Sequence, residues 1–148
     1  MQFIIELKNI IPDLKKRYFK QVFIHERESG NTVKNYSLEY DIPYLNLNME
    51  LAKLLQGVQI NRRPYKIADY LNQRLNAMPE EIICLDYYEL LFESSLQINP
   101  FDLFEKISKN KTLIIAWRGN IHDSHFIHAE PGHPEYRIYP TEDALVIN

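Results

Sequence analysis

Cysteine and glycine are scarce in this sequence of 148 residues, and it has no excess of positive charge. Because Cys84 is the only cysteine, the sequence excludes an intrachain disulfide and a zinc site built from several thiolates. Because Cys84 lies within the apolar run Ile82–Leu85, we expect it to be a small buried residue. With only four glycines to mark boundaries, the organisation of the chain has to be inferred from hydrophobic periodicity.

The net charge is −3, so no excess of basic residues attracts nucleic acid or anionic lipid, and we expect no direct nucleic-acid binding. Residues 1–11 are apolar but are interrupted by Glu6, Lys8 and Asn9, and no small-residue cleavage site follows them. This pattern predicts neither a signal peptide nor a membrane-spanning helix. We therefore expect a cytoplasmic protein that does not enter a membrane.

Hydrophobic residues make up 45% of the chain and charged residues 25%, which is typical of a globular domain. We expect residues 1–148 to form a single domain. Short apolar segments alternate with segments of helical periodicity, and this alternation favours an α/β fold with a parallel sheet and helices on both faces. The predicted strands are 21–25, 42–48, 82–85 and 113–117, and the predicted helices lie within 1–19, 32–40, 49–56, 64–76 and 99–107.

Individual residues indicate where helices begin or are interrupted, and the C-terminal segment has a pattern of its own. Pro12 predicts a kink or a break in the N-terminal helical segment 1–19. Asn48 and Asn99 are predicted to cap the helices that follow them. Residues 120–148 are expected to form a C-terminal loop and an edge strand at Arg137–Tyr139.

The segment His25–Thr32 has the spacing of a phosphate-binding P-loop, G-x-x-x-x-G-K-[ST]. Gly30, Asn31 and Thr32 occupy its last three positions, where Gly30 and Thr32 could contact phosphate and Mg²⁺. His25 replaces the first glycine, and Asn31 replaces the lysine that neutralises the β- and γ-phosphates. The spacing therefore predicts a P-loop whose residues no longer suit a nucleoside triphosphate.

Two carboxylates, those of Glu26 and Glu28, fall within the same loop. Like charges a few ångströms apart repel by about 1–4 kcal/mol, depending on screening. We therefore expect ATP with Mg²⁺ to bind weakly or not at all, and we expect no other cofactor. The segment also fits an ordinary strand-to-helix turn in which Thr32 caps the helix.

Asp86 follows four apolar residues, which is the form of a Walker B strand whose carboxylate holds Mg²⁺ through water. Glu89, three residues later, could orient an attacking water, so Asp86 and Glu89 are the candidate catalytic residues. An aspartate at a strand end is also a common turn former. Arg118 directly follows the predicted strand 113–117, where P-loop ATPases often keep a polar sensor, although a surface arginine fits the position as well.

Four of the five histidines lie close together near the C-terminus, at positions His122, His125, His128 and His133. The first three have helical i, i+3 spacing, which would place them on one face and could bind Zn²⁺. However, Pro131 and Gly132 favour a loop, so a metal site ranks below the other hypotheses. For His133 and Glu135 a structural turn or a contact with a partner is preferred.

Several segments together resemble BrxF, the small P-loop protein of type 3 BREX systems, which protect bacteria against bacteriophage. The similarity runs from about Phe19 to Tyr139 and depends on the order and spacing of its segments rather than on one motif. These segments are Ile42–Asn48, Leu85–Asp86 with Glu89–Phe92, Asn110–Leu113 with Ala116–Trp117, and Gly132–Tyr136. The resemblance implies a P-loop NTPase-like fold and an accessory role beside other BREX proteins.

This chain departs from the BrxF pattern in the P-loop itself, because the family carries an intact glycine-rich loop with a lysine. Two hypotheses follow. The favoured one is an adaptor without ATP hydrolysis that contacts other proteins of the defence system, with exposed aromatics such as Tyr65 or Tyr87 and Tyr88 as anchors. The alternative is a weak or composite ATPase that uses Asp86 together with Arg27 or a basic residue of another subunit. The sequence leaves open whether the chain forms an oligomer.

Overall fold

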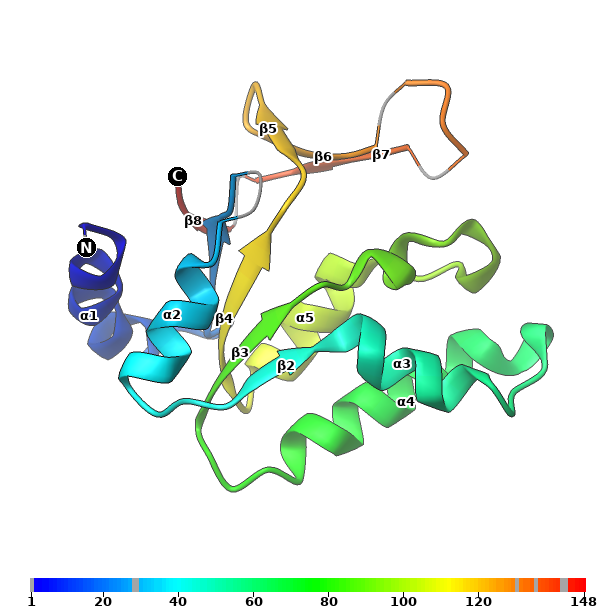
Figure 1. The fold of residues 1–148 in the computed structure, drawn as a ribbon, viewed down its shortest axis with the longest axis horizontal. Coiled ribbons are helices and arrows are strands. Elements are labelled where there is room, and N and C mark those ends of the chain that lie inside the picture. The colour runs from blue at the N-terminus through cyan, green and yellow to red at the C-terminus, as the bar shows by residue number, and fades with distance from the viewer. Residues whose placement is uncertain (1, 28–29, 130, 135, 142–143) are drawn as a thin grey trace.

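Five parallel strands in the order β2-β3-β4-β1-β8 form the central sheet (Figure 1). The structure is a computed structural model, and it describes residues 2–27, 30–129, 131–134, 136–141 and 144–148. The strands are β1 (Gln21–His25), β2 (Tyr44–Asn46), β3 (Ile82–Asp86), β4 (Thr112–Trp117) and β8 (Leu145–Ile147). The first four fall on the segments predicted as strands, and the mainly parallel sheet is confirmed.

Successive side chains in these strands point to opposite faces of the sheet and enter two separate hydrophobic cores. In β1, Val22 and Ile24 belong to one core, whereas Phe23 belongs to the other. Ile114 and Ile115 of β4 divide in the same way. Because both faces are apolar, each strand reads as an unbroken apolar run, and both faces have to be covered by helices.

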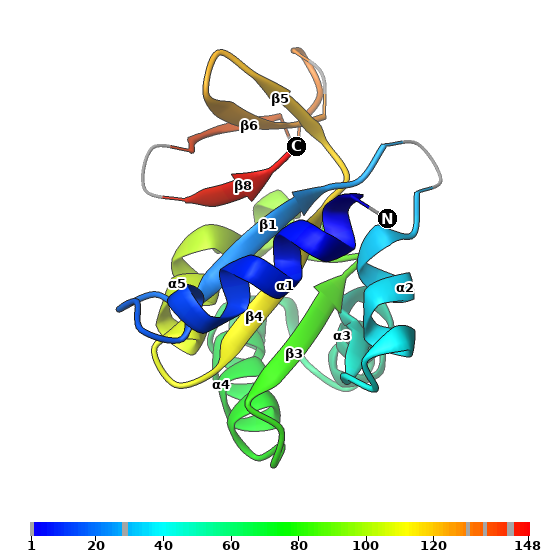
Figure 2. The same cartoon turned by 90° about the vertical axis from the view of Figure 1, so that its left-hand side faces the viewer.

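Helices cover the two faces of the sheet in separate groups (Figure 2). On one face lie α1 (Gln2–Leu14) and α2 (Thr32–Glu39). The other face carries α3 (Leu47–Leu55), α4 (Arg63–Asn76) and α5 (Pro100–Ser108). The predicted three-layer α/β arrangement is therefore confirmed. Among the helices that the structure describes, none is long and apolar enough to span a membrane.

The helix ends follow the sequence signals in one case and depart from them in two. The side chain of Asn99 accepts hydrogen bonds from the amides of Phe101 and Asp102, as predicted for the cap of α5. Asn46, not Asn48, caps α3. The helix α1 continues through Pro12, so the predicted break into two helices is wrong, whereas the predicted kink stays a prediction.

A second sheet of three antiparallel strands lies beyond the carboxyl ends of the central strands (Figure 1). Its strands are β5 (Asn120–His122), β6 (His125–His128) and β7 (Arg137–Pro140). The expected edge strand at 137–139 is thus a strand, but it pairs with β6 in this second sheet, and β8 takes the edge of the central sheet. Part of the expected loop is also strand, namely β5 and β6. A two-residue hairpin turn joins them, and its residues Asp123 and Ser124 have the positive φ angles that such a turn requires.

Three short 3-10 helices complete the described chain: η1 (Ile60–Arg62), η2 (Glu89–Phe92) and η3 (Ser94–Leu96). Two residues separate the η2 helix from the end of β3, so the helix lies next to the carboxyl edge of the sheet, below the second sheet (Figure 1). The residues of the candidate site lie along this edge.

Candidate functional site

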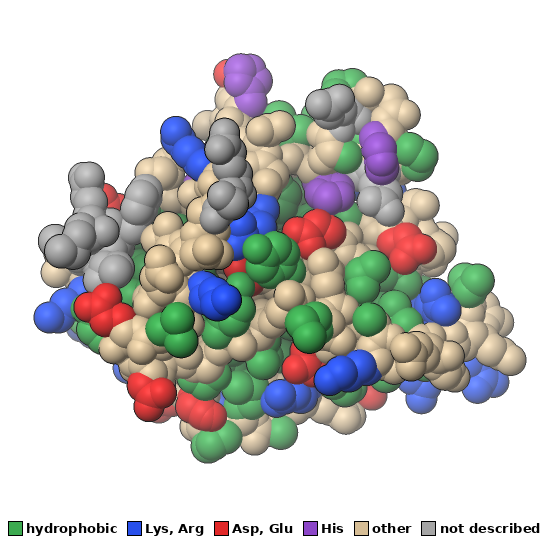
Figure 3. Space-filling model, viewed as in Figure 1, with side chains coloured by type: hydrophobic (Ala, Val, Ile, Leu, Met, Phe, Trp, Pro, Cys, Tyr) green, Lys and Arg blue, Asp and Glu red, His purple; other side chains and the backbone are tan. Residues whose placement is uncertain are grey.

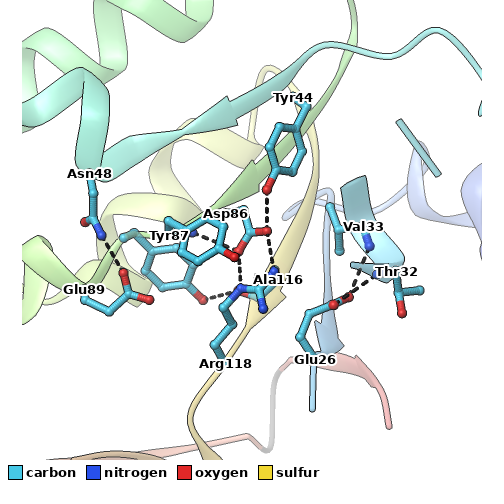
Figure 4. A network of polar contacts seen from close by, with 11 residues as sticks. Glu26, Thr32, Val33, Tyr44, Asn48, Asp86, Tyr87, Glu89, Ala116 and Arg118 are labelled. Carbon is cyan, nitrogen blue, oxygen red and sulfur yellow. Dashed lines mark hydrogen bonds and ion pairs between the residues drawn. The ribbon is translucent and has the colours of Figure 1, made fainter. Parts of the chain in front are cut away.

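The carboxyl ends of β1, β3 and β4 bring together Glu26, Asp86 and Arg118 (Figure 4). Glu26 and Arg118 each follow the last residue of a strand, and Asp86 is the last residue of β3. Ligands of parallel α/β sheets usually bind at this edge, which makes it the candidate site. The sequence identified all three residues but did not predict that Asp86 and Arg118 contact each other.

The carboxylate of Asp86 is fully buried and accepts four hydrogen bonds. Oδ1 lies 2.8 Å from Arg118 Nε and 2.9 Å from the amide nitrogen of Tyr87. Oδ2 lies 2.9 Å from Arg118 Nη2 and 2.6 Å from the hydroxyl oxygen of Tyr44. A carboxylate offers about four lone-pair positions, so these donors use its whole capacity.

The donors around Asp86 are held in their protonated forms. The hydrogen bond to Asp86 raises the pKa of Arg118 above its ordinary value even though burial acts in the opposite direction. Burial, and then the hydrogen bond to Asp86, raise the pKa of Tyr44. The guanidinium carbon of Arg118 also lies 4.3 Å from the centre of the Tyr87 ring, where a cation–π attraction adds to the ion pair.

Glu26 lies in the loop that has P-loop spacing and binds the start of the helix that follows it. Its side chain is almost fully buried, and its two carboxylate oxygens accept hydrogen bonds from the amides of Thr32 (3.0 Å) and Val33 (3.1 Å). These are the first amides of α2, which also present the positive end of the helix dipole. The segment is thus a strand-to-helix turn, as one hypothesis predicted, but the prediction that Thr32 caps the helix is wrong, because Thr32 is the first residue of α2 and its amide donates to Glu26.

Gly30 and Asn31 flank this carboxylate without adding a side-chain bond to it. A Cβ atom at Gly30 would lie 3.0 Å from Glu26 Oε2 and from the carbonyl oxygen of Arg27, so the glycine gives room for the carboxylate. Asn31 is exposed, and its side chain makes no capping hydrogen bond to α2. Glu28, the second carboxylate of the loop, lies outside the described residues.

Glu89 lies apart from Asp86, at the start of η2. Its Oε2 accepts a hydrogen bond of 2.6 Å from Asn48 Nδ2, and Asn48 Oδ1 accepts the amide of Leu90 at 3.0 Å. Asn48 thus joins the start of α3 to η2 and does not cap α3. Glu89 and Arg118 line a cavity of about 290 Å³ together with His128. In Figure 3, acidic, basic and histidine side chains lie near one another below the second sheet.

The histidines of the C-terminal region do not share a helical face. His122 and His125 lie on two strands joined by the hairpin turn, and the ring of His128 stacks on Phe92 at 4.0 Å between ring centres. His133 lies in the turn before β7. Within the described residues, no group of three or more histidine, cysteine or acidic side chains could hold a metal ion. Glu135 lies outside the described residues.

Comparison of the chain with protein-family models, with curated proteins and with solved structures gave no match.

Proposed function

We propose that this chain is an accessory component of a BREX-like anti-phage defence system, a P-loop-fold adaptor that does not hydrolyse ATP and acts through contacts with other proteins. The order of the sequence segments that resemble BrxF supports the defence role. Two features of the site support the loss of nucleotide use. The Glu26 carboxylate lies where a phosphate would bind, and the Arg118 guanidinium lies where a metal ion would be held.

The observation that carries the proposal is the position of the Glu26 carboxylate. In a working P-loop the amides at the start of the following helix bind phosphate. Here the amides of Thr32 and Val33 already bind the two oxygens of a buried carboxylate. A triphosphate would have to displace Glu26 and then lie beside its negative charge, and Asn31 supplies no compensating cation.

Asp86 supports the same conclusion from the opposite side of the site. A Walker B aspartate needs a free oxygen to hold the water shell of Mg²⁺. Both oxygens of Asp86 are occupied by two donors each, and the strongest of these is the cation Arg118. The guanidinium thus supplies the positive charge that a metal ion would supply in an active P-loop protein.

Protein contacts are supported by apolar side chains that the fold leaves outside its cores. Tyr65 of α4 is 81% exposed, and nearby Ile60 of η1 is 62% exposed. By contrast, Tyr88 is buried and contributes to the core, and the ring of Tyr87 lies beside Arg118. Of the three tyrosines suggested as anchors, Tyr65 is thus the most exposed.

Calorimetric titration with ATP and Mg²⁺ tests the nucleotide part of the proposal. We expect no binding by the natural chain and measurable binding by a variant with Glu26→Gln, Glu28→Gln and Asn31→Lys. The matched control keeps both glutamine substitutions but places the lysine one turn later, as Asn35→Lys, and should not bind. Micromolar binding by the natural chain would contradict the proposal and favour the composite ATPase, in which Asp86 acts with a basic residue supplied from elsewhere.

The defence part of the proposal is tested in the host. Deletion of the gene should raise the plating efficiency of phages that the host normally restricts, and the natural gene should restore protection. A complementing gene with Tyr65→Ser should restore less protection, while Lys66→Ser, its exposed neighbour, serves as the control. Unchanged plating after deletion would contradict a role in defence.

A further inference from the structure

Two loops at the amino edge of the central sheet concentrate positive charge. Residues 15–20 lie between α1 and β1, and residues 109–111 lie between α5 and β4. Six of the chain's 17 basic residues fall in these nine positions, and none of its 20 acidic residues does. These basic residues are Lys15, Lys16, Arg17, Lys20, Lys109 and Lys111. The net charge of −3 conceals this concentration, because it averages over a chain that is strongly acidic elsewhere.

The fold joins the two loops into one surface, which we call the basic edge (residues 15–20 and 109–111). β1 and β4 are neighbouring parallel strands, so the loops that precede them lie side by side (Figure 2). The amide of Lys20 donates to the carbonyl oxygen of Ser108 at 3.0 Å, and its ammonium donates to the carbonyl oxygen of Lys109 at 2.9 Å. The basic edge lies at the opposite end of the strands from the candidate site.

An exposed aromatic ring lies among these cations. Tyr18 is 67% exposed, and its ring centre lies 4.8 Å from that of the half-buried Phe19. The ammonium of Lys109 lies 5.3 Å from the centre of the Tyr18 ring, within the range of a cation–π attraction. A large part of Tyr18 thus stays open to a planar group, and positive charge lies directly beside it.

Most of the cations are accessible to a ligand. The exposed ones are Lys15, Lys16, Arg17 and Lys109. Lys15 lies 3.7 Å from Glu81, but the two side chains are 44% and 82% exposed, and an ion pair of this kind is weak. Lys111 is the exception, because its ammonium donates to two carbonyl oxygens of the preceding loop 77–81. The basic edge therefore offers about four charges to an anion.

We propose that the basic edge binds single-stranded nucleic acid, with phosphates beside the cations and one base stacked on Tyr18. Net charge alone predicts no such binding, but a local concentration of charge can attract a polyanion to one surface. Phosphates and bases alternate along a strand, which suits an aromatic ring between basic side chains. A duplex keeps its bases stacked on one another, so only an unpaired strand can use the Tyr18 ring.

An anionic membrane would also match the charge, but the chemistry of the basic edge favours nucleic acid. Helices that bind a membrane surface bury apolar side chains in the lipid. The nine residues of the basic edge include no aliphatic side chain, and Phe19 is half-buried. The proposal does not depend on the proposed function, because the basic edge and the candidate site share no residue.

Fluorescence anisotropy with the full chain tests the proposal on labelled dT and rU strands of about 15 nucleotides. We expect a Kd of about 100 μM or below, and a slope of about −3 for log affinity against log salt concentration, the value for four phosphates of a single strand. The tighter of the two strands identifies DNA or RNA as the ligand. The duplex of the same length should bind more weakly than the single strand. No binding of either strand, or equal competition by polyglutamate or by phosphatidylserine vesicles at equal negative charge, would overturn the proposal.

Variants at exposed positions separate specific contacts from general charge. Lys16→Gln with Arg17→Gln should lower the affinity about tenfold or more and make the salt slope shallower by about 1.4. Lys53→Gln with Lys66→Gln, on α3 and α4, removes the same charge and should change neither quantity. An equal loss of affinity in this control pair would overturn the proposal.

Tyr18 variants test the stacked base. Tyr18→Leu should lower the affinity about fivefold or more at an unchanged salt slope, because one base loses its aromatic partner. Tyr18→Phe keeps the ring and should bind as the natural chain does. Because Tyr18 is exposed, we expect the same melting temperature in both variants. Equal affinities of the natural chain and Tyr18→Leu would overturn the proposal.

Discussion

Arg118 and Asp86 form a side-on ion pair in which Nε and Nη2 of the arginine reach the two oxygens of the carboxylate at 2.8 and 2.9 Å. The pair joins the carboxyl ends of two neighbouring strands, β4 and β3. Since the Asp86 side chain is fully buried, Arg118 and the hydroxyl of Tyr44 replace the water that would otherwise stabilise its charge. The pair thus stabilises the edge of the sheet, and under the proposed function it also occupies the oxygens that would otherwise hold a metal ion.

Replacement of Arg118 by methionine should therefore lower the free energy of unfolding by about 3–5 kcal/mol, because it leaves a buried carboxylate without its cation. The double variant with Arg118→Met and Asp86→Asn should recover a large part of this loss. Urea unfolding followed by circular dichroism measures both effects. Arg17→Met, at an exposed position, is the control. A loss below about 1 kcal/mol in the single variant would mean that the ion pair behaves as an exposed one.

Glu26→Gln tests the internal anion at the start of α2. The amide side chain keeps one acceptor oxygen but loses the charge and the second oxygen, so either the amide of Thr32 or that of Val33 loses its partner. We expect the free energy of unfolding to fall by about 1–2 kcal/mol, the usual cost of losing a helix cap. Arg27→Gln, the exposed neighbouring residue, should change it little. A stability equal to that of the natural chain would show that the carboxylate is not needed at the helix start.

The local sequence predicted four of the five strands of the central sheet, its five α-helices and the edge where the site lies, because apolar runs and helical periodicity depend on near neighbours. It also pointed to Asp86 and to an unfavourable carboxylate at Glu26. It did not predict that Tyr44 and Arg118 bind Asp86, because these residues are 42 and 32 positions away along the chain. Only the pairing of β2 and β4 with β3 brings them together.

The second sheet was missed for a related reason. His122, His125 and His128 fit a helical spacing as well as two short strands, and periodicity over so few residues does not distinguish them. The signal that favours the hairpin is the polar pair Asp123–Ser124 between Ile121 and Phe126, which pair across the strands. Two residues of this type between apolar neighbours suit a tight turn.

Alkaline pH should destabilise the fold through its buried tyrosines. Burial is the first cause that raises the pKa of the Tyr44 hydroxyl in the folded chain. The unfolded chain loses the proton near pH 10, so it binds fewer protons than the folded chain above that pH. The stabilising contribution is therefore complete below about pH 10 and is lost as the pH rises further. Burial likewise raises the pKa of Tyr36, Tyr70, Tyr88 and Tyr139.

The measurement is the free energy of unfolding in urea at a series of pH values from about 8 to 11. We expect a constant value up to about pH 10 and a decline above it. Tyr44→Phe should lower the value at neutral pH, because the hydroxyl no longer donates to Asp86, and should make the decline shallower. Tyr65→Phe, at an exposed position, is the control and should keep the natural slope. An unchanged slope in Tyr44→Phe would show that the Tyr44 hydroxyl does not contribute to the loss of stability at alkaline pH.

Cys84 should react with thiol reagents only after the fold opens. The residue is fully buried in the core below α1 and α2, and burial, followed by the charge of Asp86, raises the pKa of its thiol to about 12. Since the thiolate is the reactive form, both access and ionisation protect it. We expect labelling at neutral pH to be on the order of 100-fold slower or more in buffer than in denaturant. A variant with Ser95→Cys, at an exposed position, should acquire one label at once while Cys84 stays unmodified. Equally rapid labelling of both thiols would show that this core opens readily. If Cys84 is labelled slowly, as we expect, its rate of labelling measures how often the layer of α1 and α2 opens.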